Sequence, residues 1–335
     1  MLDADVAPDQ HLRSALPGVL APLGEVTSLE RLTGGMFATT FRATLAGGRR
    51  VVVKTAPTAT DRLLTYEHDL LRTEALVYGL AADRPGLLMP RLLLTDFTRT
   101  AVPSDVVVAS HLDGVPLLDL AVDGTLPAEV EAAVRPQLGA LMARLHAVTG
   151  ERFGYPDPTT ALAGSTWPDA FGRIVGALLD DARRWGTELP AAEVRSALAR
   201  HRTALAEVVR PALVHTDLWA GNLFVDPATL RLTGVIDPER AVWGDPLLEL
   251  AGADQTGLGP VPEDLVAGYA EAAGATGPLP LGTPAGDARL LLYRMSMTLV
   301  LLVEMAPRGY AGPGADAHRA TCTATLRAVL DDLAG

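Results

Sequence analysis

The first part of the chain alternates apolar and polar residues in short runs that end at glycine pairs. The runs and the bends between them are residues 29–32, Gly34-Gly35, residues 37–45, Gly47-Gly48 and residues 51–54. A period of two is typical of strands that bury one face, and glycine favours tight bends between strands. The pattern therefore predicts an antiparallel meander of three strands.

Apolar residues return at helical spacing after the third run. Between residues 63 and 82, Leu70, Ala75 and other apolar residues recur among charged ones, which predicts an amphipathic helix. Residues 92–94 and 106–109 are apolar runs joined by a polar turn, and we expect two further strands there.

The character of the chain changes after residue 112. Long helical patterns, many of them rich in alanine, follow at residues 128–148, 167–185, 191–209, 262–273, 288–305 and 318–333. Residues 223–225 and 232–236 are the exceptions, being strand-like runs around a turn. A chain of 335 residues is long for one compact layer. We therefore expect two lobes with a cleft between them: residues 1–112 with the sheet, and residues 113–335, mostly helical.

Composition narrows the classes of partner. The 48% hydrophobic content is that of a folded globular protein. The net charge of −12, from 40 acidic residues against 28 Lys and Arg, disfavours binding to nucleic acid or to an anionic membrane surface. The single cysteine, Cys322, excludes an internal disulfide and a thiolate-cluster metal site. With no secretory signal pattern and no long apolar run, we expect a cytoplasmic protein, monomeric or homodimeric.

Three polar residues with fixed spacing carry the most specific chemistry. Asp217 is followed five residues later by Asn222 and twenty residues later by Asp237, with two strand-like runs between. Each residue alone is an ordinary turn residue. Together they form the set that phosphoryl transfer uses, namely a carboxylate that accepts the proton of the attacking hydroxyl and oxygen ligands for metal ions that bridge the phosphates.

At these residues the chain resembles the aminoglycoside phosphotransferase family and its relatives, the fructosamine (ketosamine) kinases, which share the two-lobed α+β fold of protein kinases. The family's catalytic loop has the form His-x-Asp-x-x-x-x-Asn, and His215, Asp217 and Asn222 match it. The sequence of residues 217–222, Asp-Leu-Trp-x-Gly-Asn, is especially similar to the corresponding loop of ketosamine kinases. The resemblance implies that Asp217 is the catalytic base, that Asn222 and Asp237 bind Mg²⁺, that ATP or GTP donates the phosphate, and that His215 braces the loop.

The resemblance extends to a lysine and a glutamate in the first lobe. Lys54 ends the third strand-like run, and Glu74 follows twenty residues later in the expected helix. By resemblance, Lys54 pairs with Glu74 and contacts the α- and β-phosphates. Glu67 stays open as an alternative partner, because residues seven apart on one continuous helix share a face.

Other parts of the nucleotide site leave weaker traces. Gly34 and Gly35 lie where a phosphate-covering loop is expected, although they depart from the Gly-x-Gly-x-x-Gly of protein kinases. By resemblance, the main chain from Ser110 to Leu112 contacts the adenine edge.

Two expectations concern the surroundings of the catalytic loop. Pro238 should restrict Asp237 to extended geometry, which suits a fixed metal ligand. Asp245 and Pro246 have the order of a helix N-cap and its first residue, and we expect Asp245 to hold the catalytic loop.

The sequence therefore predicts an ATP-dependent O-phosphotransferase acting on a small hydroxyl compound, either an aminoglycoside-like or another antibiotic, with a role in antibiotic resistance. The alternative is a ketosamine or other sugar-metabolite kinase. The acidic balance of the chain favours a cationic acceptor. A protein kinase fits less well, because Asp237 is followed by Pro238-Glu239 and not by Phe-Gly. An inactive scaffold of the same fold predicts loss of Lys54, Asp217 or Asp237, and all three are present.

Overall fold

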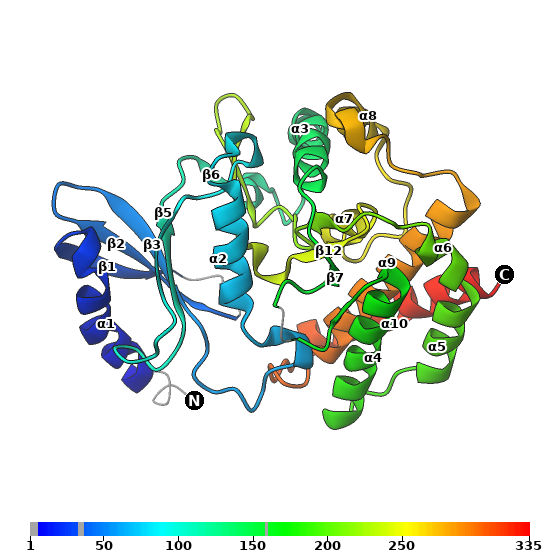
Figure 1. Ribbon diagram of the computed structural model, residues 1–335, viewed down its shortest axis with the longest axis horizontal. Coiled ribbons are helices and arrows are strands. Elements are labelled where there is room, and N and C mark those ends of the chain that lie inside the picture. Colours follow the sequence, from blue (N-terminus) through cyan, green and yellow to red (C-terminus); the bar gives the residue numbers. More distant parts are fainter. Residues whose placement is uncertain (1–5, 33–36, 158–159) are drawn as a thin grey trace.

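The computed structural model describes residues 6–32, 37–157 and 160–335, with side chains in the first helix from residue 12 onward. A sheet with two helices forms one end of the molecule, and a larger, mostly helical part forms the other (Figure 1). This is the two-lobed arrangement predicted from the sequence.

The smaller part is built on a five-stranded antiparallel sheet with the strand order β1-β2-β3-β5-β4. Its elements are α1 (Val6–Leu20), β1 (Val26–Leu32), β2 (Thr39–Leu45), β3 (Arg50–Thr55), α2 (Leu70–Ala81), β4 (Leu92–Asp96) and β5 (Val106–Ser110). The predicted meander and the two further strands are therefore confirmed. Helix α1 was not predicted, since its sequence contains a proline in the helix interior, Pro17.

The two faces of this sheet have different partners. On one face Leu16 of α1 belongs to a core with Phe41 of the sheet, and on the other Leu71 of α2 packs with Val107. Successive side chains of a strand point to opposite faces, and in β3 the valines on either side of Val52 are buried in the α1 core. Lys54 therefore lies on the face that α2 covers.

The helix predicted over residues 63–82 is wrong in its first part. Thr65–Glu67 form a 3₁₀ turn, Asp69 has a positive φ of 58°, and α2 begins only at Leu70. A left-handed residue cannot continue a right-handed helix. Glu67 and Glu74 therefore do not share a helix face.

The larger part contains the remaining helices and two small sheets, with the orders β11-β10-β6 and β8-β7-β12-β9. Its strands are β6 (Val115–Pro116), β7 (Phe153–Gly154), β8 (Ala163–Gly164), β9 (Ala212–Val214), β10 (Leu223–Val225), β11 (Leu232–Val235) and β12 (Val242–Gly244). Its helices are α3 (Ala128–His146), α4 (Trp167–Arg184), α5 (Ala191–Arg200), α6 (Arg202–Ala206), α7 (Leu248–Ala253), α8 (Glu263–Ala272), α9 (Pro284–Val303) and α10 (Pro313–Ala334). All six predicted helical segments are present, although the segment 191–209 is divided in two at His201.

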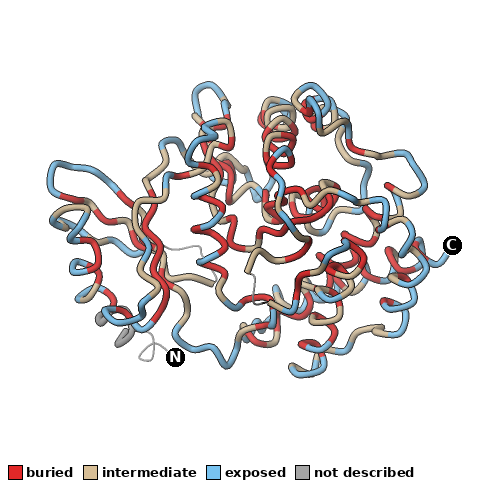
Figure 2. Tube along the Cα trace, viewed as in Figure 1, coloured by how far each residue is buried: buried red, intermediate tan, exposed pale blue. Residues whose placement is uncertain are grey.

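The main core crosses between the two parts of the chain. Leu64, Val77 and Leu87 belong to the same buried cluster as the helices after residue 128, and Figure 2 shows buried positions along α2 as well as along the helices of the larger part. Helix α2 also packs against the turn Pro238–Arg240. The segment that carries Glu74 is thereby held against the segment that carries Asp237. The lobe boundary at residue 112 stays a prediction.

Among the described residues, no helix has the length and apolar character needed to cross a membrane.

Candidate active site

Lys54, Glu74 and Asp237 meet at the junction of β3, α2 and the turn Pro238–Arg240, which we call the cleft. The Nζ atom of Lys54 lies 2.9 Å from Oε2 of Glu74 and 2.6 Å from Oδ1 of Asp237. Burial alone would lower the pKa of Lys54, but the carboxylates of Asp237 and Glu74 outweigh it and raise that pKa well above its usual value. The lysine is therefore a permanent cation that joins positions 183 residues apart in the chain.

Glu67, the alternative partner of Lys54, is engaged elsewhere. Its Oε1 atom lies 2.6 Å from Nη2 of Arg308, and its Oε2 atom accepts a hydrogen bond of 2.8 Å from the backbone N–H of Leu64. Because the left-handed Asp69 turns the chain between the two glutamates, only Glu74 faces the lysine.

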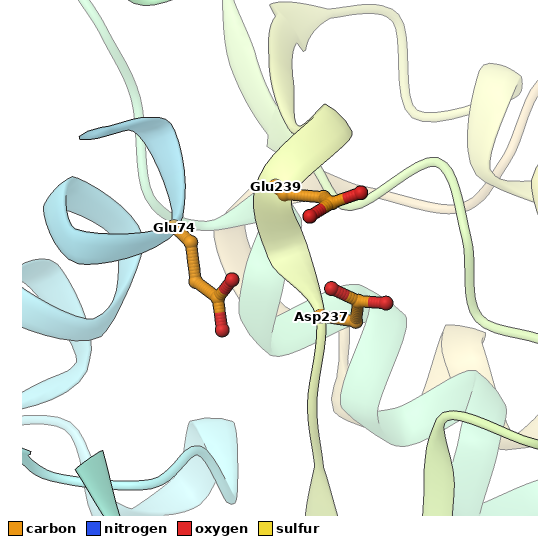
Figure 3. Close-up of side chains that lie close together, drawn as sticks. All are labelled: Glu74, Asp237 and Glu239. Atoms are coloured by element: carbon orange, nitrogen blue, oxygen red, sulfur yellow. The ribbon is translucent and has the colours of Figure 1, made fainter. Parts of the chain in front are cut away.

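A third carboxyl group, which the sequence analysis did not single out, joins this cluster. Oxygen atoms of Glu74, Asp237 and Glu239 all lie within 4.8 Å of one another, with Glu74 on α2 and the other two on the turn opposite (Figure 3). Burial and the charge of Asp237 raise the pKa of Glu239 well above its usual value. The cluster thus combines three carboxyl groups with one ammonium group.

The backbone of Asp237 differs from the sequence prediction. Its φ of 67° and ψ of 45° are left-handed rather than extended, so the prediction drawn from Pro238 is wrong. Aspartate is among the few residue types that adopt this conformation readily. The ion pair with Lys54 and the backbone bond from Ile236 N–H to the carbonyl of Asn222, 3.0 Å, hold the turn in place.

Both carboxylate oxygens of Asp217 accept side-chain hydrogen bonds. Asn222 donates from Nδ2 to Oδ2 of Asp217 and to its backbone oxygen, each at 2.9 Å, and Gln255 donates from Nε2 to Oδ1 at 2.7 Å. Burial raises the pKa of Asp217, while the positive charge of Arg240 acts in the opposite direction.

His215 connects the catalytic loop to the segment before Asp237. Its Nδ1 atom accepts the backbone N–H of Asp217 at 3.3 Å, so Nε2 carries the proton and donates to the carbonyl oxygen of Ile236 at 3.0 Å. This geometry is that of a brace between the two loops.

The residue that fixes the loop backbone is Glu249, which the sequence analysis missed. Its fully buried carboxylate accepts the backbone N–H groups of His215 and Thr216, both at 2.8 Å. Thr216 has a φ of 69°, which is rare for a β-branched residue and costs conformational energy. The two hydrogen bonds offset part of that cost and hold Asp217 in position.

Asp245 was expected to hold the loop, but within the described part of the chain it makes no hydrogen bond or ion pair with that loop. Its carboxylate accepts the backbone N–H of Leu247 at 3.1 Å and the hydroxyl of Tyr293 at 2.7 Å, and it lies 3.0 Å from Nε of Arg289. The N-cap of α7 is Leu247, which makes no side-chain capping bond, so the prediction of Asp245 as N-cap and Pro246 as first helical residue is wrong. The Asp245 side chain instead links the turn before α7 to α9. Glu249, four residues later and within α7, makes the contact with the loop.

The match to a family model follows this geometry: residues 28–285 match the model of the phosphotransferase enzyme family. The chain belongs to that family. The matched region contains Lys54 with the sheet that carries it, and Asp217 and Asp237 with the hairpin of β10 and β11 between them.

Three solved structures show the same fold as this phosphotransferase. A putative aminoglycoside phosphotransferase from Ralstonia eutropha is 16% identical with a TM-score of 0.66, covering 96% of this chain and 98% of its own. A putative fructosamine-3-kinase from Thermobifida fusca is 24% identical with a TM-score of 0.63, covering 97% and 99%. A thermostable mutant of aminoglycoside phosphotransferase APH(4)-Ia, in a ternary complex with ADP and hygromycin B, is 21% identical with a TM-score of 0.62, covering 95% and 98%. The two-lobed protein-kinase-like fold is thereby established.

Four further residues were predicted to contact the nucleotide in this phosphotransferase: Gly34, Gly35, Ser110 and Leu112. Gly34 and Gly35 lie outside the described residues. Ser110 already donates its backbone N–H to the carbonyl of Arg91 at 2.9 Å, and the side chain of Leu112 packs against Gly234. Contact of Ser110 and Leu112 with the adenine edge stays a prediction.

The donor set of the cleft fits magnesium. Mg²⁺ prefers oxygen ligands, and carboxylates above all. Asp237 and Glu239 supply carboxylate oxygens. The amide of Asn222 directs its nitrogen to Asp217, which leaves its oxygen available as a ligand.

Proposed function

We propose that this small-molecule kinase transfers the γ-phosphate of ATP to a hydroxyl group, with Asp217 as the base. The observation that carries the proposal is the ion pair of 2.6 Å between Lys54 and Asp237, because it joins the sheet of the smaller part to the segment that follows the catalytic loop. In phosphotransferases, groups at such positions hold the phosphates and their metal.

Each residue of the cleft has a distinct task in this reaction. Lys54 holds the α- and β-phosphates, and Glu74 keeps the lysine in place. Asp217 orients the attacking hydroxyl and accepts its proton as the oxygen bonds to the γ-phosphorus, while the bond to the β-phosphate oxygen breaks and ADP leaves. Asn222 and Asp237, together with Glu239, hold Mg²⁺, which supplies charge neutralisation on the phosphates.

For the acceptor, we propose an aminoglycoside-like or other antibiotic of cationic character. The solved relative that binds hygromycin B has the same fold over nearly the whole chain, and the net charge of −12 attracts cations. Trp219, two residues after the base, is 40% exposed, and its ring lies against Gly221 of the same loop. A ketosamine is the second candidate, favoured by the loop wording around Trp219 and by the likeness to a putative fructosamine-3-kinase.

The test is release of ADP from magnesium ATP across a panel of aminoglycosides, macrolides, fructosamines and simple sugars. One class should be phosphorylated, and the Asp217→Asn variant should lose about a hundredfold or more in kcat while it keeps nucleotide binding, since a positioned base contributes about 10²–10⁴-fold. Full turnover by the folded Asp217→Asn variant would refute the role of the base. A parent protein that binds the nucleotide and transfers phosphate to no compound would be a binding scaffold.

A further inference from the structure

The place where an acceptor hydroxyl must bind Asp217 is occupied by a side chain of the protein itself. Oδ2 of Asp217 accepts from Asn222, and Oδ1 accepts from Gln255, at 2.9 and 2.7 Å. A hydroxyl that gives its proton to Asp217 has to donate a hydrogen bond to one of these oxygens. This inference rests on the proposed function.

Of the two donors, Asn222 is held more firmly. Its side chain donates to both the carboxylate and the backbone oxygen of Asp217. Its own backbone N–H donates to the carbonyl of Trp219, and its carbonyl accepts from Ile236, both at 3.0 Å. Gln255 makes one side-chain bond, to Oδ1. Oδ1 is therefore the oxygen that can exchange its partner.

The position of Gln255 follows from the packing of α7 against the catalytic loop. A Cβ atom at Gly252 would lie 2.2 Å from the carbonyl oxygen of Thr216, so the end of the helix touches the residue before the base. Gln255 comes two residues after the last residue of this helix, Ala253. The packing of α7 on the loop therefore positions the Gln255 amide within hydrogen-bonding distance of Asp217.

The segment after Gln255 is anchored on both sides. Asp254 accepts the backbone N–H of Gly257 at 3.0 Å, and Arg294 of α9 donates to the carbonyl oxygens of Leu258 and Gly259, at 3.3 and 2.6 Å. These contacts fix the backbone and leave the half-exposed Gln255 side chain as the movable part.

We propose that Gln255 takes the place of the acceptor hydroxyl on Asp217 and is displaced when the acceptor binds. Until then, its amide keeps water from the base. Without this amide, water can donate to Oδ1 in place of the acceptor. The oxygen of this water then bonds to the γ-phosphorus, and a proton of the water passes to Asp217. The bond from the γ-phosphorus to the β-phosphate oxygen breaks, and the products are ADP and inorganic phosphate.

The test compares Gln255→Ala with Thr256→Ala, an exposed neighbour on the same segment. With magnesium ATP and no acceptor, Gln255→Ala should release ADP and phosphate roughly fivefold faster than the parent. This factor corresponds to the net contribution of one hydrogen bond. Thr256→Ala should match the parent. Gln255→Asn keeps the amide but is shorter by one methylene group, and it should behave like Gln255→Ala.

A second measurement separates displacement from simple orientation of the base. If Gln255 competes with the acceptor, its removal lowers KM for the best compound of the panel by a similar factor. If Gln255 only orients Asp217, its removal lowers kcat for the acceptor and leaves ATP hydrolysis without acceptor unchanged. That result would overturn the proposal.

The double variant Asp217→Asn with Gln255→Ala distinguishes the two claims. It should lose the extra hydrolysis, because water then has no base. Extra hydrolysis that survives in the double variant would contradict the role of Asp217 and with it the proposed function. Equal rates in Gln255→Ala, Thr256→Ala and the parent would overturn only the role of Gln255.

Discussion

Two buried groups of charged residues lie close together in this molecule, and they differ in how their positive and negative groups are matched. The first group, in the cleft, has one cation and three carboxyl groups: Lys54, Glu74, Asp237 and Glu239. The second has two cations and two carboxylates: Glu67, Arg240, Glu304 and Arg308. Buried charges are stable when they are paired. The second group is complete by itself, whereas the first has carboxyl groups in excess, which a cation must balance.

The second group links distant segments of the chain. Glu304 lies 2.8 Å from Nη2 of Arg240 and 2.9 Å from Nη1 of Arg308, and it also accepts the hydroxyl of Tyr66. Burial opposes the charge of Arg240, but Glu304 outweighs it and keeps the pKa of Arg240 well above its usual value. The network thus ties the turn after Asp237 to the segment that follows α9.

The pKa shifts of the carboxyl groups in the cleft reflect this excess of negative charge. In the cleft, burial raises the pKa of Glu74, with Lys54 opposing it, and burial together with Asp237 raises that of Glu239. Burial also acts to raise the pKa of Asp237, but Lys54 outweighs it and holds that pKa below its usual value. One lysine does not neutralise three carboxyl groups. A group of residues that is unstable as a set of charges, yet built on two packed elements, is typical of a site that binds a ligand.

Breaking the balanced group should have the largest effect on stability. Arg308→Met leaves Glu67 and Glu304 each without one partner, and we expect a loss of about 3–5 kcal/mol in the free energy of unfolding. Urea denaturation measures it. The control is Arg183→Met, which removes an exposed pair with Asp180 and should cost less than about 1 kcal/mol. Equal losses in the two variants would contradict the structural role of the network.

Within the cleft, the Lys54 and Glu74 defects should overlap. Lys54→Met and Glu74→Gln each raise KM for the nucleotide or lower kcat. Because partners in one ion pair act as a unit, the double variant should fall short of the summed effects by roughly 0.5–3 kcal/mol. Steady-state kinetics on the four proteins measures this coupling. A larger effect from Glu67→Gln than from Glu74→Gln would return the pairing to Glu67.

The smallest effect concerns the pH dependence of the base. Burial raises the pKa of Asp217, and the protonated carboxyl group cannot accept a proton. The value of kcat/KM should therefore fall on the acid side at a pH above about 3.9, the ordinary value for aspartate. The pH profile of the parent measures it, and the residual activity of the Asp217→Asn variant should lack that limb. Constant activity down to pH 4 would count against a buried base.

Short-range patterns made part of the site predictable. Asp217, Asn222 and Asp237 stand at fixed spacing along one stretch, the local patterns put Lys54 at a strand end and Glu74 in a helix, and the family resemblance paired the two. A period or a motif is visible in the sequence because all its members are close together.

Tertiary contacts were beyond the reach of such patterns. Glu249 and Gln255 contact the catalytic loop across more than thirty residues, and nothing at either position differs from an ordinary helix or loop residue. The left-handed Asp69, which directly precedes the first residue of α2, likewise left no signal in the helical pattern. Helix α1 was missed because its proline lowers the helical signal, while the apolar face of the sheet that it covers stabilises it.

The central claim is that the excess of carboxyl groups in the cleft binds magnesium together with a nucleotide. Asp237→Asn tests it most directly, since asparagine also adopts the left-handed backbone found there. Calorimetric titration with ADP, with and without magnesium, should show that the variant has lost the gain in affinity that magnesium gives the parent. Its free energy of unfolding in metal-free buffer should fall by less than that of Arg308→Met, because Lys54 keeps Glu74 as a partner at 2.9 Å. A variant that keeps the parent's magnesium dependence, or that unfolds as readily as Arg308→Met, would contradict the account.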